Sequence, residues 1–294
     1  MTSVLIADGG PEKGAGHWVR MLALAHVLPD PILVTPQWNG EARPPTAWDK
    51  PPCPVEIVDT MWDVADFAKS ADIAVFDTFE AANNFHGWHG PTFATVDDMG
   101  DAIVAGADYV INPAVGAERL TYKTDATKLL GAKYALLRPE FAQMRTERDY
   151  DRCETLVICT GGGNSWKPYE EWLKSLTQSF PGEVVWFGRV PNYEAAIHTL
   201  ARADLAISTA STTVLELLCL GIPTLTFACS PNQEVVQEGL LRVHATVPLN
   251  ATNFEAMQEH PINRASHGVC GMGLVDGLGA QRVAQHLTGK TLRL

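Results

Sequence analysis

The chain has 294 residues, which is enough for two medium-sized domains or for one large α/β unit. Hydrophobic residues make up 46% and charged residues 19% of the sequence, an ordinary globular composition that excludes disorder, collagen and coiled coils. With 22 Lys and Arg against 34 Asp and Glu, the formal net charge is -12. Because no basic cluster offsets this charge, we expect neither nucleic acid nor an anionic membrane as a partner.

Targeting and redox signals point to a cytoplasmic protein. The first residues show no basic region, apolar run and cleavage site of a signal peptide. The most apolar stretch, residues 214–229, contains Glu216, Gly221 and Pro223, so it predicts a helix, a turn and a buried strand rather than a membrane span. The 6 cysteines are scattered without a CxxC pair, which fits a reducing compartment. We expect no bound metal and no other cofactor.

Short apolar runs alternate with helical patterns through the first half of the chain. Strands are predicted at residues 4–7, 32–35, 55–58, 73–77, 92–97 and 109–112, and helices at 17–28 and 63–70. These strands are apolar at successive positions, which is typical of a parallel sheet covered on both faces. The pattern predicts a doubly wound, Rossmann-like α/β domain.

A second series of the same kind follows the polar run 146–154. Strands are predicted at 155–160, 184–187, 205–208 and 224–228, and helices at 168–176, 193–203, 212–220 and 234–242. We therefore predict an N-terminal domain at 1–145 and a C-terminal domain at 146–294. Because α/β sheets bind ligands beyond the carboxyl ends of their strands, the expected site is the cleft between the two domains.

A glycine-rich segment, residues 9–16, joins the first strand to a helix that starts with His17. Small residues there let a ligand approach N–H groups at the positive end of the helix dipole. His17 in the first turn has the side chain of a general base for neutral pH. The alternative is a histidine that caps or packs its own helix.

Three segments of the second domain are candidates for nucleotide binding. Residues 161–163 are three successive glycines after a strand, which favours close approach of a phosphate, although a tight turn explains one or two of them. Hydroxyl residues at 208–213 precede the helix that carries Glu216, a candidate acceptor for ribose hydroxyls. Asn232 and Gln233 offer amides for a base or sugar. Local capping, or a solvated helix face for Glu216, remains the alternative for each.

Motifs in chain order form a family-like pattern over nearly the whole sequence. They are Gly14-x-Gly16-His17-x-x-Arg20, Asp97-Asp98, Leu130-Gly131-x-x-Tyr134, Gly161-Gly162, Leu220-Gly221-Ile222-Pro223, Asn232-Gln233 and Asp276-Gly277-x-Gly279. This pattern resembles the UDP-sugar hydrolases of pseudaminic acid biosynthesis. The resemblance implies a GT-B fold related to MurG-like glycosyltransferases, with two Rossmann-like domains.

The resemblance also implies roles for single residues. His17 would be the base that activates water, which attacks the anomeric carbon of the sugar and expels UDP, without a metal. The implied sugar-site residues are Gly14, Gly16, Arg20, Asp77, Asp98 and Asn112. The implied nucleotide-site residues are Gly161, Gly162, Gly163, Ser211, Thr212, Thr213, Glu216, Asn232 and Gln233.

The expected function is hydrolysis of an activated amino or deoxy sugar with release of UDP or a related nucleotide, on the way to a nonulosonic acid or a related sugar. The first alternative is a GT-B glycosyltransferase that uses a nucleotide-sugar donor, and the second is an inactive nucleotide-binding protein. A transferase with a membrane acceptor would need a basic and apolar patch, which the sequence does not show. We expect a monomer whose ligand is a nucleotide-sugar.

Overall fold

The computed structural model describes residues 1–8, 15–36, 51–59, 61–78, 92–100, 106–161, 163–187 and 193–289. The chain divides into two compact units, of which the first comprises Met1–Pro139 together with the segment from Leu278 onward, and the second comprises Glu140–Gly277. The division thus lies between Pro139 and Glu140, whereas the sequence analysis placed it at 145. It also assigned residues 278–294 to the C-terminal domain, whereas the described part of this segment belongs with the first unit.

The first unit is built on a seven-stranded parallel sheet with the order β3-β2-β1-β4-β5-β6-β7. Its strands are β1 (Ser3–Ala7), β2 (Pro31–Pro36), β3 (Val55–Val58), β4 (Ile73–Asp77), β5 (Thr92–Val96), β6 (Tyr109–Asn112) and β7 (Thr127–Leu130). Every residue of β1 and β4 is buried, as their continuous apolar character predicts. The carboxyl ends of these two central strands lie side by side, with Ala7 opposite Asp77.

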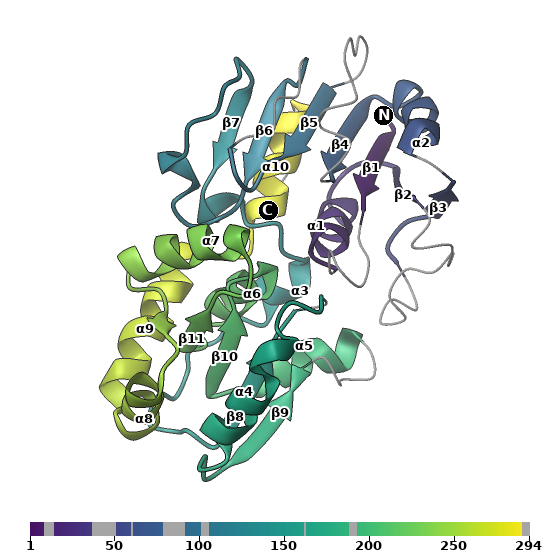
Figure 1. Cartoon of the computed structure of the whole chain (residues 1–294). Helices are drawn as coiled ribbons and strands as arrows, with labels where there is room; N and C mark the ends of the chain where they lie inside the picture. The colour runs from purple at the N-terminus through teal and green to yellow at the C-terminus, as the bar shows by residue number, and fades with distance from the viewer. Residues whose placement is uncertain are drawn as a thin grey trace. The chain divides into compact units, whose positions relative to one another are not determined.

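Helices cover both faces of this sheet. Residues of β1 alternate between the faces: Leu5 packs in the same core as the helix α1 (Gly16–Ala25), and Val4 and Ile6 pack in the same core as α2 (Met61–Lys69). The helix α10 (Gly279–Thr288) lies beside α1 on the first of these faces (Figure 1). Its apolar stripe, which includes Val283 and Leu287, is part of the same core as Leu5. This burial explains why the C-terminal segment belongs to the first unit.

The second unit has a five-stranded parallel sheet with the order β12-β11-β10-β8-β9. Its strands are β8 (Thr155–Cys159), β9 (Glu183–Trp186), β10 (Leu205–Thr209), β11 (Thr224–Phe227) and β12 (Val247–Pro248). Its helices are α3 (Pro139–Gln143), which starts at the division between the units, and α4 (Glu170–Thr177), α5 (Tyr193–Arg202), α6 (Thr212–Cys219), α7 (Pro231–Arg242), α8 (Ala251–Glu259) and α9 (Pro261–Leu274). Residues 214–229 form the predicted helix, turn and buried strand, as α6 and β11 show.

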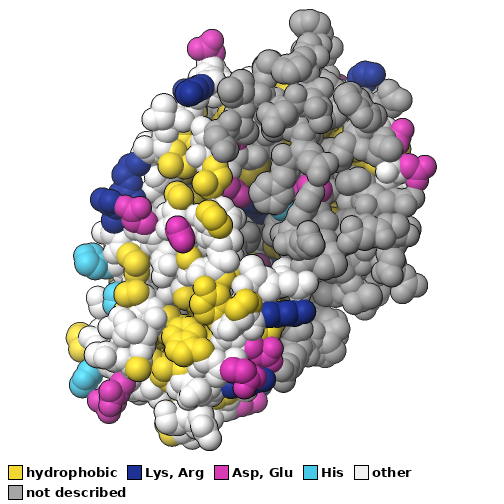
Figure 2. Space-filling view, viewed as in Figure 1, with side chains coloured by type: hydrophobic (Ala, Val, Ile, Leu, Met, Phe, Trp, Pro, Cys, Tyr) yellow, Lys and Arg dark blue, Asp and Glu magenta, His cyan; other side chains and the backbone are white. Residues whose placement is uncertain are grey.

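Charged side chains on the surface are mixed in sign. Figure 2 shows Lys and Arg scattered over the described surface of one face, several of them beside Asp or Glu. Arg242 pairs with Glu238 on α7, and Lys174 pairs with Glu170 and Glu171 on α4. No helix in the described part of the chain has the length and apolar character needed to cross a membrane.

Substitution of Val283 tests which core α10 stabilises. Val283→Ala removes two methyl groups from a side chain that is 0% exposed and should lower the free energy of unfolding of the first unit by about 2 kcal/mol. Val269→Ala is the matched control, because it makes the same change at a helical position that is 61% exposed. Hydrogen exchange should become faster in β1 and β4 for the first variant alone. Faster exchange in β8 and β10 instead would contradict the assignment of α10 to the first unit.

Candidate functional site

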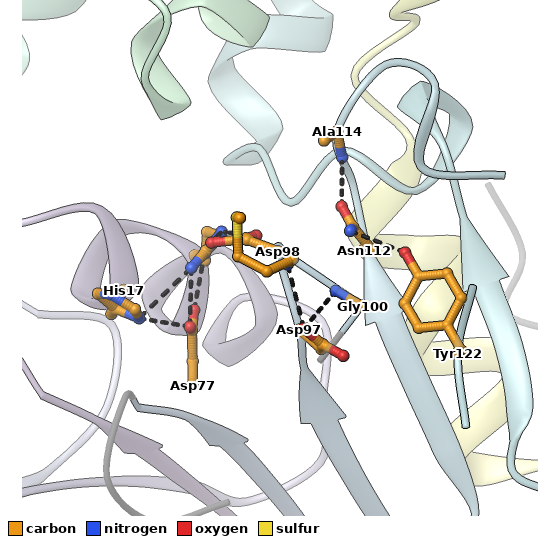
Figure 3. Close-up of polar contacts among 10 residues, drawn as sticks. His17, Asp77, Asp97, Asp98, Gly100, Asn112, Ala114 and Tyr122 are labelled. Atoms are coloured by element: carbon orange, nitrogen blue, oxygen red, sulfur yellow. Dashed lines mark hydrogen bonds and ion pairs between the residues drawn. The ribbon is translucent and has the colours of Figure 1, made fainter. Parts of the chain in front are cut away.

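His17 lies at the carboxyl edge of the first sheet because α1 begins at Gly16, soon after β1 ends. Asp77 is the last residue of β4, the strand that neighbours β1. The start of α1 therefore meets the end of β4, and His17 Nδ1 lies 2.5 Å from Asp77 Oδ1 (Figure 3). Both side chains are buried, with relative exposures of 8% and 1%.

Arg20 lies one helical turn after His17 and binds two carboxylates. Its Nε and Nη2 donate to Asp77 Oδ2 and Oδ1 at 2.7 and 2.8 Å, which is a bidentate pair. Its Nη1 donates to both oxygens of Asp98, at 2.7 and 2.9 Å. The guanidinium thus links the end of β4 to the turn after β5, and Asp77 Oδ1 lies within hydrogen-bond distance of both His17 and Arg20.

The charges in this cluster set its protonation states. Burial would raise the pKa of Asp77, but Arg20 and His17 outweigh it and lower this pKa to about 2. Burial would lower the pKa of His17, but the Asp77 carboxylate outweighs it and raises this pKa above 6.5, with Arg20 opposing the rise and Asp8 adding to it. An ionised carboxylate only accepts hydrogen bonds, so Nδ1 of His17 carries the proton toward Asp77. In the neutral imidazole, Nε2 is then the acceptor nitrogen.

Asn112 and Asp97 lie along the same edge of the sheet (Figure 3). Asn112 ends β6, and its Nδ2 donates to the hydroxyl of Tyr122 at 2.8 Å while its Oδ1 accepts from the backbone N–H of Ala114 at 3.0 Å. Asp97 Oδ1 accepts from the backbone N–H groups of Met99 and Gly100 at 3.1 and 2.8 Å. Asp97 thus stabilises the turn that carries Asp98, and Asn112 stabilises the start of the segment after β6 and its contact with Tyr122.

In the second unit, the ends of β8 and β10 bring together a glycine and two hydroxyls. Thr209 Oγ1 donates to Ser211 Oγ at 3.2 Å, and Ser211 precedes the first turn of α6 without capping it through its side chain. Gly161 has a φ of +77°, and a Cβ there would lie 3.7 Å from Thr209 Oγ1 and 3.8 Å from Ser211 Oγ. A methyl group at Gly161 would therefore lie in contact with these hydroxyls, next to the N-terminus of α6.

Two other predicted groups of the second unit have local roles in the structure. Glu216 is 6% exposed, which is inconsistent with the solvated helix face considered for it, and together with burial it raises the pKa of the Cys159 thiol at the end of β8. Gln233 Oε1 accepts from the backbone N–H of Cys229 at 3.1 Å, and Asn232 Oδ1 accepts from Ser230 Oγ at 2.6 Å. Both amide oxygens thus make local contacts at the start of α7.

The structure brings His17, Arg20, Asp77 and Asp98 into one hydrogen-bonded cluster, while Asn112 makes its contacts with Tyr122 and Ala114. Gly16 starts α1, Thr212 and Thr213 start α6, and Gly163 follows the end of β8. Gly14 and Gly162 lie outside the described residues. No three His, Cys, Asp or Glu side chains among the described residues form a metal-binding group.

Two residues of this region, Asp8 and Tyr122, were not predicted from the sequence. Asp8 is 4% exposed directly after β1 and contributes to the raised pKa of His17, and its position at a strand end was the available signal. Tyr122 is the partner of Asn112, and burial raises its pKa. Nothing in the local sequence around Tyr122 indicated this contact, because it depends on the path of the chain after β6.

Comparisons with known proteins support the fold. No family model matches the chain, and no curated protein matches it. Among solved structures, MurG of Acinetobacter baumannii has a TM-score of 0.61 at 14% identity, covering 99% of this chain and 100% of that one. A Streptomyces sp. SF2575 glycosyltransferase complexed with thymidine diphosphate has a TM-score of 0.60 at 12% identity, covering 99% and 100%. S. aureus MnaA in a co-structure with UDP has a TM-score of 0.58 at 9% identity, covering 100% and 99%. The chain therefore has the GT-B fold.

The Arg20–Asp77 pair should be a major source of stability in the first unit. Arg20→Met leaves a buried carboxylate without its bidentate cation and should lower the free energy of unfolding by about 3–5 kcal/mol. The double variant Arg20→Met/Asp77→Asn should recover part of this loss, because the fully buried carboxylate is removed together with its cation, and only the more exposed Asp98 still lacks its partner. The control, Arg242→Met, breaks an ion pair whose partners are 58% and 63% exposed and should change stability little. Stability is measured by urea unfolding at pH 7. Equal losses of unfolding free energy for Arg20→Met and Arg242→Met would contradict this assignment.

Proposed function

We propose that the chain is a nucleotide-sugar hydrolase that releases UDP or a related nucleotide from an activated amino or deoxy sugar. The observation that carries the proposal is the His17–Asp77 pair, in which Asp77 orients the imidazole through Nδ1. This is the arrangement in which a carboxylate fixes the tautomer of a histidine that acts as a general base. The GT-B fold, which solved structures complexed with UDP and thymidine diphosphate also adopt, is consistent with this class of substrate.

In the proposed reaction, Nε2 of neutral His17 takes a proton from water while the water oxygen bonds to the anomeric carbon of the sugar. The bond between that carbon and the diphosphate oxygen breaks, and its electron pair leaves with the nucleotide. Asp77 stabilises the imidazolium that forms, because its carboxylate lies 2.5 Å from Nδ1. The products are the free sugar and the nucleoside diphosphate, and no metal is part of the proposal.

The diphosphate is proposed to bind at Gly161 and at the start of α6, where Ser211, Thr212 and Thr213 supply hydroxyls and backbone N–H groups. The helix dipole is positive at this end, so an anion is stabilised there without a lysine. Gly162 and Gly163 are proposed to shape the same loop, Glu216 to accept from the ribose hydroxyls, and Asn232 and Gln233 to contact the base or sugar. Such a site explains how a chain with a net charge of -12 can hold an anionic ligand.

A GT-B glycosyltransferase is the second candidate, because solved structures of similar fold include a glycosyltransferase. In a transferase the same histidine would deprotonate an acceptor hydroxyl instead of water.

A thermal-shift screen of UDP, CDP, GDP, CMP and dTDP identifies the nucleotide. Turnover of its sugar conjugates in ¹⁸O-labelled water then separates the candidates, because hydrolysis at the anomeric carbon places ¹⁸O in the sugar and none in the phosphate. Turnover that depends on an added acceptor would favour the transferase.

The remaining proposals concern context. We propose that the protein is a cytoplasmic monomer, that the product serves nonulosonic acid or related sugar biosynthesis as the family resemblance implies, and that neither nucleic acid nor a membrane is a partner. Sedimentation analysis at micromolar concentration checks the oligomeric state, and a dimer would contradict that part.

Replacing His17 separates chemistry from binding. His17→Ala should reduce kcat by at least about 10²-fold, because the general base is lost, while the affinity for the nucleotide product stays within twofold. His198→Ala, at an exposed position on α5, is the matched control and should behave as wild type. Turnover is followed by release of nucleotide and affinity by calorimetry. Wild-type turnover of His17→Ala would exclude the proposed mechanism.

Replacing Gly161 tests the proposed phosphate site. Gly161→Ala puts a methyl group beside the hydroxyls of Thr209 and Ser211 and should weaken binding of the nucleoside diphosphate at least about tenfold. Gly289→Ala is the matched control, because its φ of +63° imposes similar backbone strain with nothing within 4 Å of the new methyl group. Both variants should lose comparable stability. Equal affinities in calorimetry would place the phosphates elsewhere.

A further inference from the structure

The contacts of Arg20 conflict with its expected role in binding the sugar. Arg20 is 6% exposed, and its Nε, Nη1 and Nη2 each donate to a carboxylate of the protein. Two parallel bonds reach Asp77, and Nη1 holds both oxygens of Asp98. A planar guanidinium held by carboxylates on two sides has a fixed position, and its plane has a fixed orientation. Its N–H donors are therefore used within the protein and not for the sugar.

Three charged groups set the ionisation of the His17 imidazole: the Asp77 carboxylate at the end of β4, Arg20, and the Asp8 carboxylate after β1. Asp98, which follows β5, holds Arg20. Arg20 is the cation on α1 itself, with Nη2 3.4 Å from Nδ1 of His17. Asp77 Oδ1 is 2.5 Å from His17 and 2.8 Å from Arg20 Nη2, so the anion that faces the histidine is shared with the arginine.

We infer that Arg20 is a positioning residue for the base: anchored by Asp98, it holds the Asp77 carboxylate in line with Nδ1 of His17 and limits the pull of that carboxylate on the histidine proton. This inference rests on the proposed role of His17 as a base. A base must be neutral to accept a proton, and buried carboxylates alone would keep the imidazole charged. Arg20 neutralises part of their field. Its opposing influence on the pKa of His17 supports this conclusion.

The experiment measures the ionisation of His17 directly, by NMR titration of the imidazole, together with the pH dependence of kcat/KM. Activity should fall with decreasing pH as His17 becomes protonated, so the acidic limb reports the pKa of His17. Arg20→Gln should move both the NMR titration and the acidic limb upward by about one pH unit, the effect of removing one adjacent cation. Asp98→Asn should move both downward, because the positive charge of Arg20 beside His17 is then less compensated. Arg242→Gln, which affects only an exposed pair on α7, should move neither.

Arg20→Lys keeps the charge but loses the bidentate geometry, and it serves if Arg20→Gln does not fold. Its kcat should fall at least about tenfold with KM within twofold, because orientation and not substrate affinity is changed. A tenfold rise of KM at unchanged kcat would show that Arg20 binds substrate and would overturn the inference. So would shifts of Arg20→Gln and Asp98→Asn in the same direction. NMR can show the upward shift of Arg20→Gln and the downward shift of Asp98→Asn while neither the wild type nor any variant hydrolyses a nucleotide-sugar. In that case the inference on the ionisation of His17 holds and the proposed function fails.

Discussion

The buried carboxylate of Asp77 is the constraint on which the polar cluster of the first unit depends. An anion that is 1% exposed is stable only with hydrogen-bond donors and positive charge around it, and Arg20 and His17 supply both. These two residues are one helical turn apart, so they share the face of α1 that meets the end of β4. The Asp77 carboxylate therefore links three features: the pairing of β1 with β4, the position at which α1 begins, and the ionisation of His17.

The same coupling determines what the arginine can do. A guanidinium that must neutralise Asp77 and Asp98 has its donors committed within the protein. Arg20, which the sequence suggested as a sugar-binding residue, is in our inference the residue that sets the orientation and the basicity of the His17 imidazole. The proposed phosphate site in the second unit relies on other means, namely a left-handed glycine and a helix N-terminus, and needs no basic side chain. An acidic chain can in this way combine buried carboxylates with an anionic ligand.

Local patterns predicted much of the architecture. The strands and helices that were predicted lie within a few residues of their expected bounds, because continuous apolar runs and helical periodicity are properties of the segments themselves. Two short strands, β7 and β12, and the helices α3, α8, α9 and α10 were not predicted. Residues 278–289, which were expected in the C-terminal domain, pack with the first unit. An amphipathic stripe shows that a helix is buried on one side but not which core it joins.

By itself, the sequence determined two parallel α/β units, the glycine-rich starts of both, and His17 at the beginning of the first helix, because these follow from composition, periodicity and turn chemistry in short segments. Only the tertiary structure decided which side chains meet. Asp77 and Arg20 are separated by 57 positions in the chain, and their bidentate contact exists because β1 and β4 are neighbours in the sheet. The packing of α10 on the first unit was decided in the same way, since burial of Val283 and Leu287 depends on a surface built from the other end of the chain.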